Sequence, residues 1–146
     1  MELEYDEFGN LGHRIFEMSW EEFKELFGYN EKRRWLLEGM ELAISDFKKI
    51  GCKAFYADGS LVTSKEEPGD YDICWDDTGM ELLKAWQKCP ELFDIGRNGQ
   101  KIKDRYRGDV VPANNCPDPD SGINFVAYFM KDQEDRKKGI IRVEIE

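Results

Sequence analysis

The segment 55–73 constrains the fold of this chain more than any other part of the sequence. It contains a short apolar run, the pair Gly59-Ser60, nine further residues and then Asp70-Tyr-Asp72-Ile73. Two such runs bounded by glycine, serine and proline predict two strands joined by a turn and a loop. Because residues two apart on a strand point to the same face, we expect Asp70 and Asp72 to project side by side, about 6.6 Å apart along the strand.

Paired carboxylates beside a glycine-serine turn are typical of a site for a metal-bound nucleoside triphosphate. Two hard oxygen ligands suit Mg²⁺ or Mn²⁺ together with phosphate oxygens. The turn leaves backbone N–H groups and a hydroxyl free to hold a phosphate. We therefore predict Asp70 and Asp72 as catalytic metal ligands, and Gly59, Ser60 and the loop residue Lys65 as nucleotide-binding residues.

Each of these residues also has a simpler interpretation. Gly59-Ser60 would serve equally well as an ordinary turn, and Lys65 is more typical of a solvated loop lysine. The two acids would be ordinary turn or edge-strand carboxylates. Against this, Ile73 and Trp75 indicate a half-buried strand, which leaves the acids on its other face.

The pattern resembles the signature of the DNA polymerase β-like nucleotidyltransferase superfamily at Gly59, Ser60, Asp70 and Asp72. The resemblance implies that the turn contacts the β- and γ-phosphates and that the paired acids hold divalent metal. It also implies a third carboxylate on a later strand.

Asp109 is our choice for this third catalytic and metal-binding carboxylate, because it begins a β-branched run after a predicted helix. Glu144 on the final strand and Asp104 are the alternatives. A basic stretch holding Lys101, Lys103, Arg105 and Arg107 either helps to bind phosphates or forms an exposed helical face.

A closer resemblance covers most of the chain. The segments Trp20-Glu-Glu-Phe23, Asp58-Gly-Ser-Leu-Val-Thr63, Pro68-Gly-Asp-Tyr-Asp72 and Lys138-Gly-Ile-Ile141 look like a family of small bacterial and phage-associated nucleotidyltransferase-like proteins, labelled as domains of unknown function. This resemblance implies transfer of a nucleoside monophosphate from a nucleoside triphosphate (NTP) to a hydroxyl on a protein, an RNA end or a small molecule. It further implies a toxin–antitoxin or phage-defence setting, with a toxin or antitoxin as protein partner.

The length of 146 residues favours a single nucleotidyltransferase-like domain over 1–146, with residues 1–18 as an N-terminal arm. A net charge of −10 argues against general binding to nucleic acid. One histidine and four cysteines without a C-x-x-C pair argue against a zinc site. The acidic N-terminus is no export signal and no apolar run is long enough for a membrane, so we expect a cytoplasmic protein.

The fold class predicted from these signals is α+β, a minimal nucleotidyltransferase fold with a mixed sheet and helices mainly on one face. Within it, Arg33 and Arg34 are expected to be structural ion-pair partners, with a nucleotide or partner contact as the alternative. Met80, Leu83 and Trp86 or Gln87 are expected along one side of a helix. Predicted helices cover 20–27, 31–50, 80–89 and 100–107, and predicted strands cover 52–57, 70–75, 109–113 and 140–145. Residues 123–130 fit either a helix or a strand, and we favour the helix.

Two functions remain open at this point. The first is a metal-dependent nucleotidyltransferase, which the presence of both motif acids favours. The second is a catalytically inactive protein of the same fold that binds a nucleotide or a partner protein. The short chain, which leaves little room for a separate substrate domain, favours this alternative.

Overall fold

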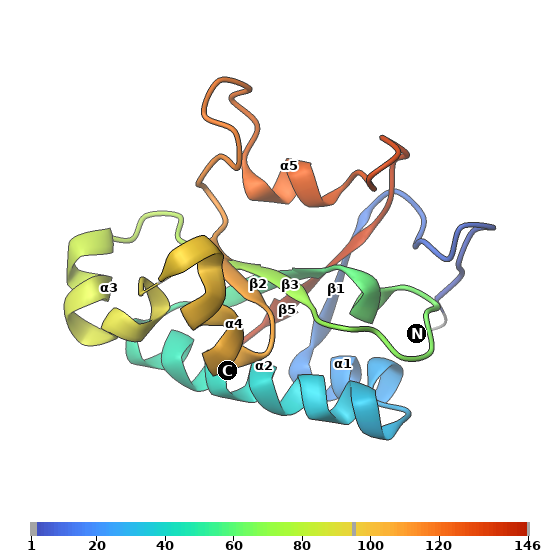
Figure 1. Cartoon of the computed structure of the whole chain (residues 1–146), viewed down its shortest axis with the longest axis horizontal. Coiled ribbons are helices and arrows are strands. Elements are labelled where there is room, and N and C mark those ends of the chain that lie inside the picture. Colours follow the sequence, from blue (N-terminus) through green and yellow to red (C-terminus); the bar gives the residue numbers. More distant parts are fainter. Residues whose placement is uncertain (1–2, 95, 146) are drawn as a thin grey trace.

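A five-stranded mixed sheet lies at the centre of the protein (Figure 1). The computed structural model describes residues 3–94 and 96–145. The strand order is β1-β5-β2-β3-β4, and β2 runs antiparallel to both of its neighbours, whereas β1 is parallel to β5 and β4 is parallel to β3. The strands are β1 (Ile15–Ser19), β2 (Ala54–Asp58), β3 (Asp72–Trp75), β4 (Asp109–Pro112) and β5 (Ile140–Glu144).

Helices lie on both faces of this sheet, most of them on one. In Figure 1, α1, α2 and α4 lie below the sheet, α5 lies above it, and α3 stands beyond one end. The helices are α1 (Trp20–Phe27), α2 (Glu31–Lys49), α3 (Leu82–Lys88), α4 (Gln100–Tyr106) and α5 (Phe125–Phe129). The predicted α+β class and mixed sheet are confirmed. None of the described helices combines the length and the apolar character needed to cross a membrane.

Local capping explains where the first two helices begin. The Ser19 side chain accepts a hydrogen bond from the Glu22 N–H, and the Glu22 side chain accepts one from the Ser19 N–H. The two bonds form a capping box. The Asn30 side chain accepts from the Arg33 N–H at 2.8 Å and caps α2. Gly51, with φ 78°, follows α2 in the left-handed region. These helix boundaries agree with the sequence prediction to within one residue.

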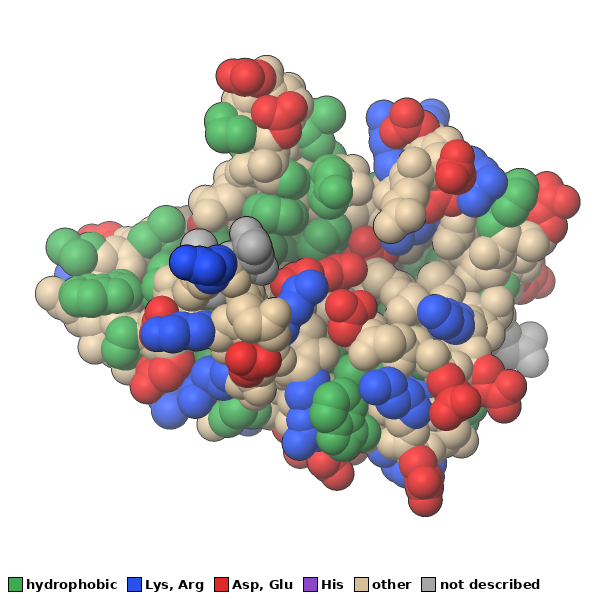
Figure 2. Space-filling view, viewed as in Figure 1, with side chains coloured by type: hydrophobic (Ala, Val, Ile, Leu, Met, Phe, Trp, Pro, Cys, Tyr) green, Lys and Arg blue, Asp and Glu red, His purple; other side chains and the backbone are tan. Residues whose placement is uncertain are grey.

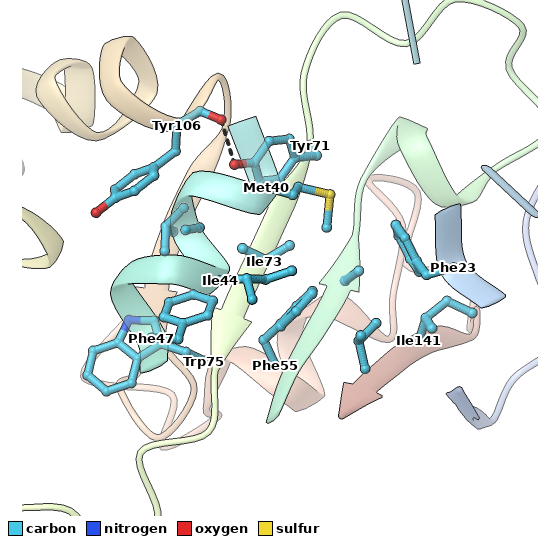
Figure 3. Packing of buried hydrophobic residues seen from close by; sticks show 14 of the residues in the cluster. Phe23, Met40, Ile44, Phe47, Phe55, Tyr71, Ile73, Trp75, Tyr106 and Ile141 are labelled. Atoms are coloured by element: carbon cyan, nitrogen blue, oxygen red, sulfur yellow. Dashed lines mark hydrogen bonds between the residues drawn. The ribbon is translucent and has the colours of Figure 1, made fainter. Parts of the chain in front are cut away.

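Alternation along the central strands divides their side chains between two cores. Phe55, Ile73 and Trp75 are fully buried in the larger core, where Trp75 and Phe47 of α2 lie 6.3 Å apart between ring centroids (Figure 3). Cys74, between Ile73 and Trp75, belongs instead to the smaller core beneath α5. Residues of β3 at even numbers therefore point toward the α5 side.

A buried tyrosine fastens α4 to the start of β3. The Tyr71 hydroxyl donates to the Tyr106 carbonyl at 2.6 Å (Figure 3). Tyr71 is fully buried, so its hydroxyl needs a partner within the protein. This bond holds the end of α4 next to β3, directly before Asp72.

Three sequence expectations are corrected by the structure. The predicted arm 1–18 contains β1, which pairs with β5 over Ile15–Ser19, and residues 1 and 2 lie outside the described residues. The helix predicted at 80–89 is shorter, and its buried residue is Ala85, whereas Leu83 and Trp86 are 68% and 50% exposed. The strand predicted from Asp70 begins only at Asp72.

Candidate carboxylate site at the Gly-Ser turn

Three aspartates lie in register across three neighbouring strands. Asp58 at the end of β2 pairs with Asp72 at the start of β3, and Asp72 pairs with Asp109 at the start of β4. Neighbouring strands are about 4.8 Å apart, so the three residues form a continuous row. Asp72 alternates with the buried Ile73, which places the row on the α5 side of the sheet.

Asp70 lies beside this row but outside the sheet. It is exposed, two residues before Asp72, and its negative charge acts on the Asp72 carboxyl group. We call Asp58, Asp70, Asp72 and Asp109 the carboxylate cluster. Figure 2 shows acidic side chains gathered near the middle of the face shown, below the apolar side chains around α5.

The Gly-Ser turn lies directly against Asp72. Gly59 has φ 85°, and a Cβ atom at this position would lie 2.9 Å from Asp72 Oδ2 and 3.2 Å from its backbone nitrogen. The Ser60 hydroxyl is 3.5 Å from the Asp70 carbonyl oxygen. Only glycine combines this close approach with a left-handed backbone. The structure therefore brings together four of the predicted site residues, Gly59, Ser60, Asp70 and Asp72.

The position of Asp72 perturbs its acid–base equilibrium. Burial raises the pKa of Asp72 to about 7, and a hydrogen bond with Asp109 and the charges of Asp109, Asp58 and Asp70 act in the same direction. Burial also raises the pKa of Asp58, against the opposing charge of Lys138. Neighbouring negative charges thus disfavour ionisation of Asp72, and a bound cation would offset this effect.

Two lysines contact the ends of the row. Lys138 forms a buried ion pair with Asp58, and Lys103 of α4 lies 3.8 Å from Asp109 Oδ2. Lys103 is the member of the predicted basic stretch that faces the cluster. The other three pair with acids elsewhere: Lys101 with Asp94, Arg105 with Asp46 and Arg107 with Glu38.

The two alternatives to Asp109 as third carboxylate have other neighbours. Glu144 pairs with Ala54 at the opposite end of β2, about 13 Å along the strand from Asp58. Asp104 is exposed on α4 and accepts from Gln100 Nε2 at 2.7 Å. Among the proposed third acids, Asp109 is the one that meets Asp72.

Lys65 and Arg33 meet in the loop that follows the Gly-Ser turn. The Lys65 side chain is exposed, and its backbone carbonyl accepts from Arg33. Arg33 is fully buried, and among residues 3–94 and 96–145 no carboxylate forms an ion pair with it, contrary to the predicted ion pair. Its guanidinium donates instead to backbone carbonyls of Phe27, Leu61, Thr63, Lys65 and Glu66. Arg33 thus holds the loop that follows the Gly-Ser turn.

The donor chemistry of the cluster fits a hard divalent cation, since carboxylate oxygens are the ligands that Mg²⁺ prefers. In the arrangement of the described residues, however, no three His, Cys, Asp or Glu side chains are grouped to hold a metal ion. Asp72 and Asp109 lie opposite each other in register, and Asp70 lies next to them outside the sheet. An ion at this site would therefore require these carboxylates to move closer together.

Asp58 and Lys138 were not predicted as site residues. The signal for Asp58 is its place directly before Gly59, because a strand that ends there and pairs with 72–75 sets Asp58 opposite Asp72. Lys138 carries no comparable signal. It lies 80 residues from Asp58 in the sequence, and their contact depends on the pairing of β2 with β5.

The fold and the cluster define an α+β protein with a row of carboxylates beside a glycine-serine turn. The chain belongs to DUF6932, described as a family of unknown function, whose family model matches residues 3–144. Comparison with curated proteins and with solved structures gave no match.

Proposed function

We propose that this protein is a metal-dependent nucleotidyltransferase, built on a minimal nucleotidyltransferase fold. It would move a nucleoside monophosphate from an NTP to a hydroxyl group on a protein, an RNA end or a small molecule. The observation that carries the proposal is the contact of Gly59 with Asp72, together with the pairing of Asp72 and Asp109. This juxtaposition supports the proposal, because a close turn beside carboxylates suits a metal-bound triphosphate.

In this proposal each residue has a separate task. Asp70, Asp72 and Asp109 would hold Mg²⁺ or Mn²⁺, which neutralises the triphosphate and polarises its phosphoryl groups. The left-handed backbone at Gly59 lets the turn approach the phosphates closely, and the Ser60 hydroxyl is a further donor. Lys103 lies next to Asp109 and supplies positive charge for the departing pyrophosphate.

Label transfer from an α-³²P-labelled NTP tests this proposal. The purified protein is incubated with the labelled NTP, Mg²⁺ or Mn²⁺ and a cell extract as source of acceptors. We expect labelled product with the wild type and loss of at least about a hundredfold in Asp72→Asn and Asp109→Asn. Asp104→Asn is the matched control, because Asp104 is exposed on α4 and its carboxylate accepts from Gln100. Equal labelling by wild type and Asp72→Asn would contradict the proposal.

A second candidate is a protein of the same fold that binds a nucleotide or a partner protein without catalysis. It is favoured by the spacing of the acids, because no three His, Cys, Asp or Glu side chains in the described part of the chain are grouped to hold a metal ion. In that case no acceptor would be labelled under any condition, whereas nucleotide or partner binding would persist in the Asp72→Asn variant.

A further inference from the structure

A buried ion pair lies at the end of the carboxylate row. The ammonium group of Lys138 contacts Asp58 Oδ1, and the two side chains are only 10% and 7% exposed. The Lys138 N–H donates to the Met130 carbonyl at 2.9 Å, and the next N–H, of Gly139, donates to the Leu11 carbonyl at 2.9 Å. The backbone around the lysine is thus fixed on both sides, which keeps its ammonium group at Asp58.

Asp58 connects this lysine to the candidate metal site. It pairs in register with Asp72, and it directly precedes Gly59 of the turn. The ammonium group of Lys138 therefore pairs with Asp58 from within the protein. A buried charge that has found such partners is costly to separate from them.

We propose that Lys138 is a positioning residue for the carboxylate cluster. It neutralises Asp58, keeps that carboxylate from serving as a metal ligand, and couples the segment 131–138 to the Gly59 turn. The part of this inference that concerns metal binding rests on the proposed function. On this account Asp70, Asp72 and Asp109 face the cation, while Asp58 and Lys138 form a neutral pair next to them.

Substituting Asp58 alone and substituting Asp58 together with Lys138 should affect cation binding differently. Removing the Asp58 charge alone leaves an uncompensated ammonium group beside the site, which repels a divalent cation. Removing both charges leaves these two positions with no net charge, as in the wild-type ion pair. If Asp58 were itself a ligand, the single and the double variant would be equally impaired.

Titration with Mn²⁺, followed by the electron paramagnetic resonance signal of the free ion at pH 8, tests the inference on the full chain. We expect Asp58→Asn to raise the Kd for Mn²⁺ about tenfold, and the double variant Asp58→Asn/Lys138→Met to return within about twofold of the wild type. Asp104→Asn and Lys137→Met, at exposed positions, control for the loss of one surface charge. A double variant as weak as Asp58→Asn would overturn the inference, and so would an Asp58→Asn variant that binds like the wild type.

A second readout needs no metal and separates this inference from the proposed function. If the wild type binds no Mn²⁺, the proposed function fails, and hydrogen exchange then decides the coupling. We expect Asp58→Asn to accelerate amide exchange in both 131–138 and the Gly59-Ser60 turn, and the double variant to recover protection in both. Exchange that changes in one segment and not in the other would overturn the inference.

Discussion

Asp72 and Asp109 are directly opposite each other on the parallel strands β3 and β4. Two carboxyl groups on neighbouring strands repel each other when both are charged. A divalent cation between them would offset this repulsion, because it balances the charge of both groups. The pair therefore destabilises the metal-free protein, and in the proposed function it would bind the cation.

The first prediction concerns the pH dependence of stability. An aspartate in the unfolded chain has a pKa near 3.9. Burial raises the pKa of Asp72 to about 7, so between these values the native state binds more protons than the unfolded state. The contribution of Asp72 to the free energy of unfolding therefore falls as pH rises from about 4 to about 7 and is constant above that.

We expect Asp72→Asn to abolish this fall in the free energy of unfolding between pH 4 and pH 7, which is at most about 4 kcal/mol. Urea denaturation in the presence of EDTA at pH 5 and pH 8 measures it, with Asp104→Asn as control. An Asp72→Asn variant whose stability changes between these pH values as much as that of the wild type would refute this account.

Gly59→Ala tests the contact between the turn and Asp72. Alanine at φ 85° is strained, and its Cβ would lie 2.9 Å from Asp72 Oδ2. We expect the free energy of unfolding to fall by about 1–3 kcal/mol. The matched control is Gly12→Ala, because no atom outside its chain neighbours lies within 4 Å of the added Cβ there. Equal thermal melting of the two variants would argue against the close approach.

Arg33→Lys tests the support of the loop behind the turn. Lysine has one ammonium group in place of the planar guanidinium and cannot reach the same set of carbonyl oxygens. We expect a loss of about 3 kcal/mol and faster proteolysis within 61–67, because buried carbonyls lose their donors. Arg34→Lys is expected to have little effect on stability, because the Arg34 side chain donates one hydrogen bond, to the Gly28 carbonyl. A comparable loss in both variants would contradict the role given to Arg33.

Lys103→Met tests which basic residue serves the nucleotide. Lys103 is 3.8 Å from Asp109 Oδ2, whereas Lys101 pairs with Asp94. In the label-transfer reaction we expect Lys103→Met to lower kcat/KM about tenfold and Lys101→Met to leave it unchanged. Equal effects of the two substitutions on kcat/KM would contradict the role proposed for Lys103.

Local sequence signals were sufficient for most elements of the fold. The capping residues Ser19 and Asn30 and the left-handed Gly51 mark the boundaries of α1 and α2, and these are interactions between near neighbours in the chain. In contrast, β1 was predicted as an arm because its strand character depends on pairing Ile15 with Ile140, 125 positions away. No local pattern encodes a parallel pairing of this kind.

The candidate site was predictable to a similar extent. The spacing of Gly59, Asp70 and Asp72 predicted that turn and acids belong together, and Asp109 was chosen from the start of its strand. Asp58 was missed because its role follows from register with Asp72. Arg33 was assigned an ion pair because charge alone suggested one, whereas carbonyl groups of a distant loop satisfy it. Such partners become visible only once the chain is folded.

Calorimetric titration with a non-hydrolysable NTP, in the presence and absence of Mg²⁺, measures whether nucleotide and metal bind at one site. We expect binding to the wild type that requires Mg²⁺, loss of that binding in Asp72→Asn, and normal binding in Asp104→Asn. Nucleotide binding that is independent of Mg²⁺ and unchanged in Asp72→Asn would contradict the claim that the carboxylate cluster and the Gly59 turn form a metal–nucleotide site.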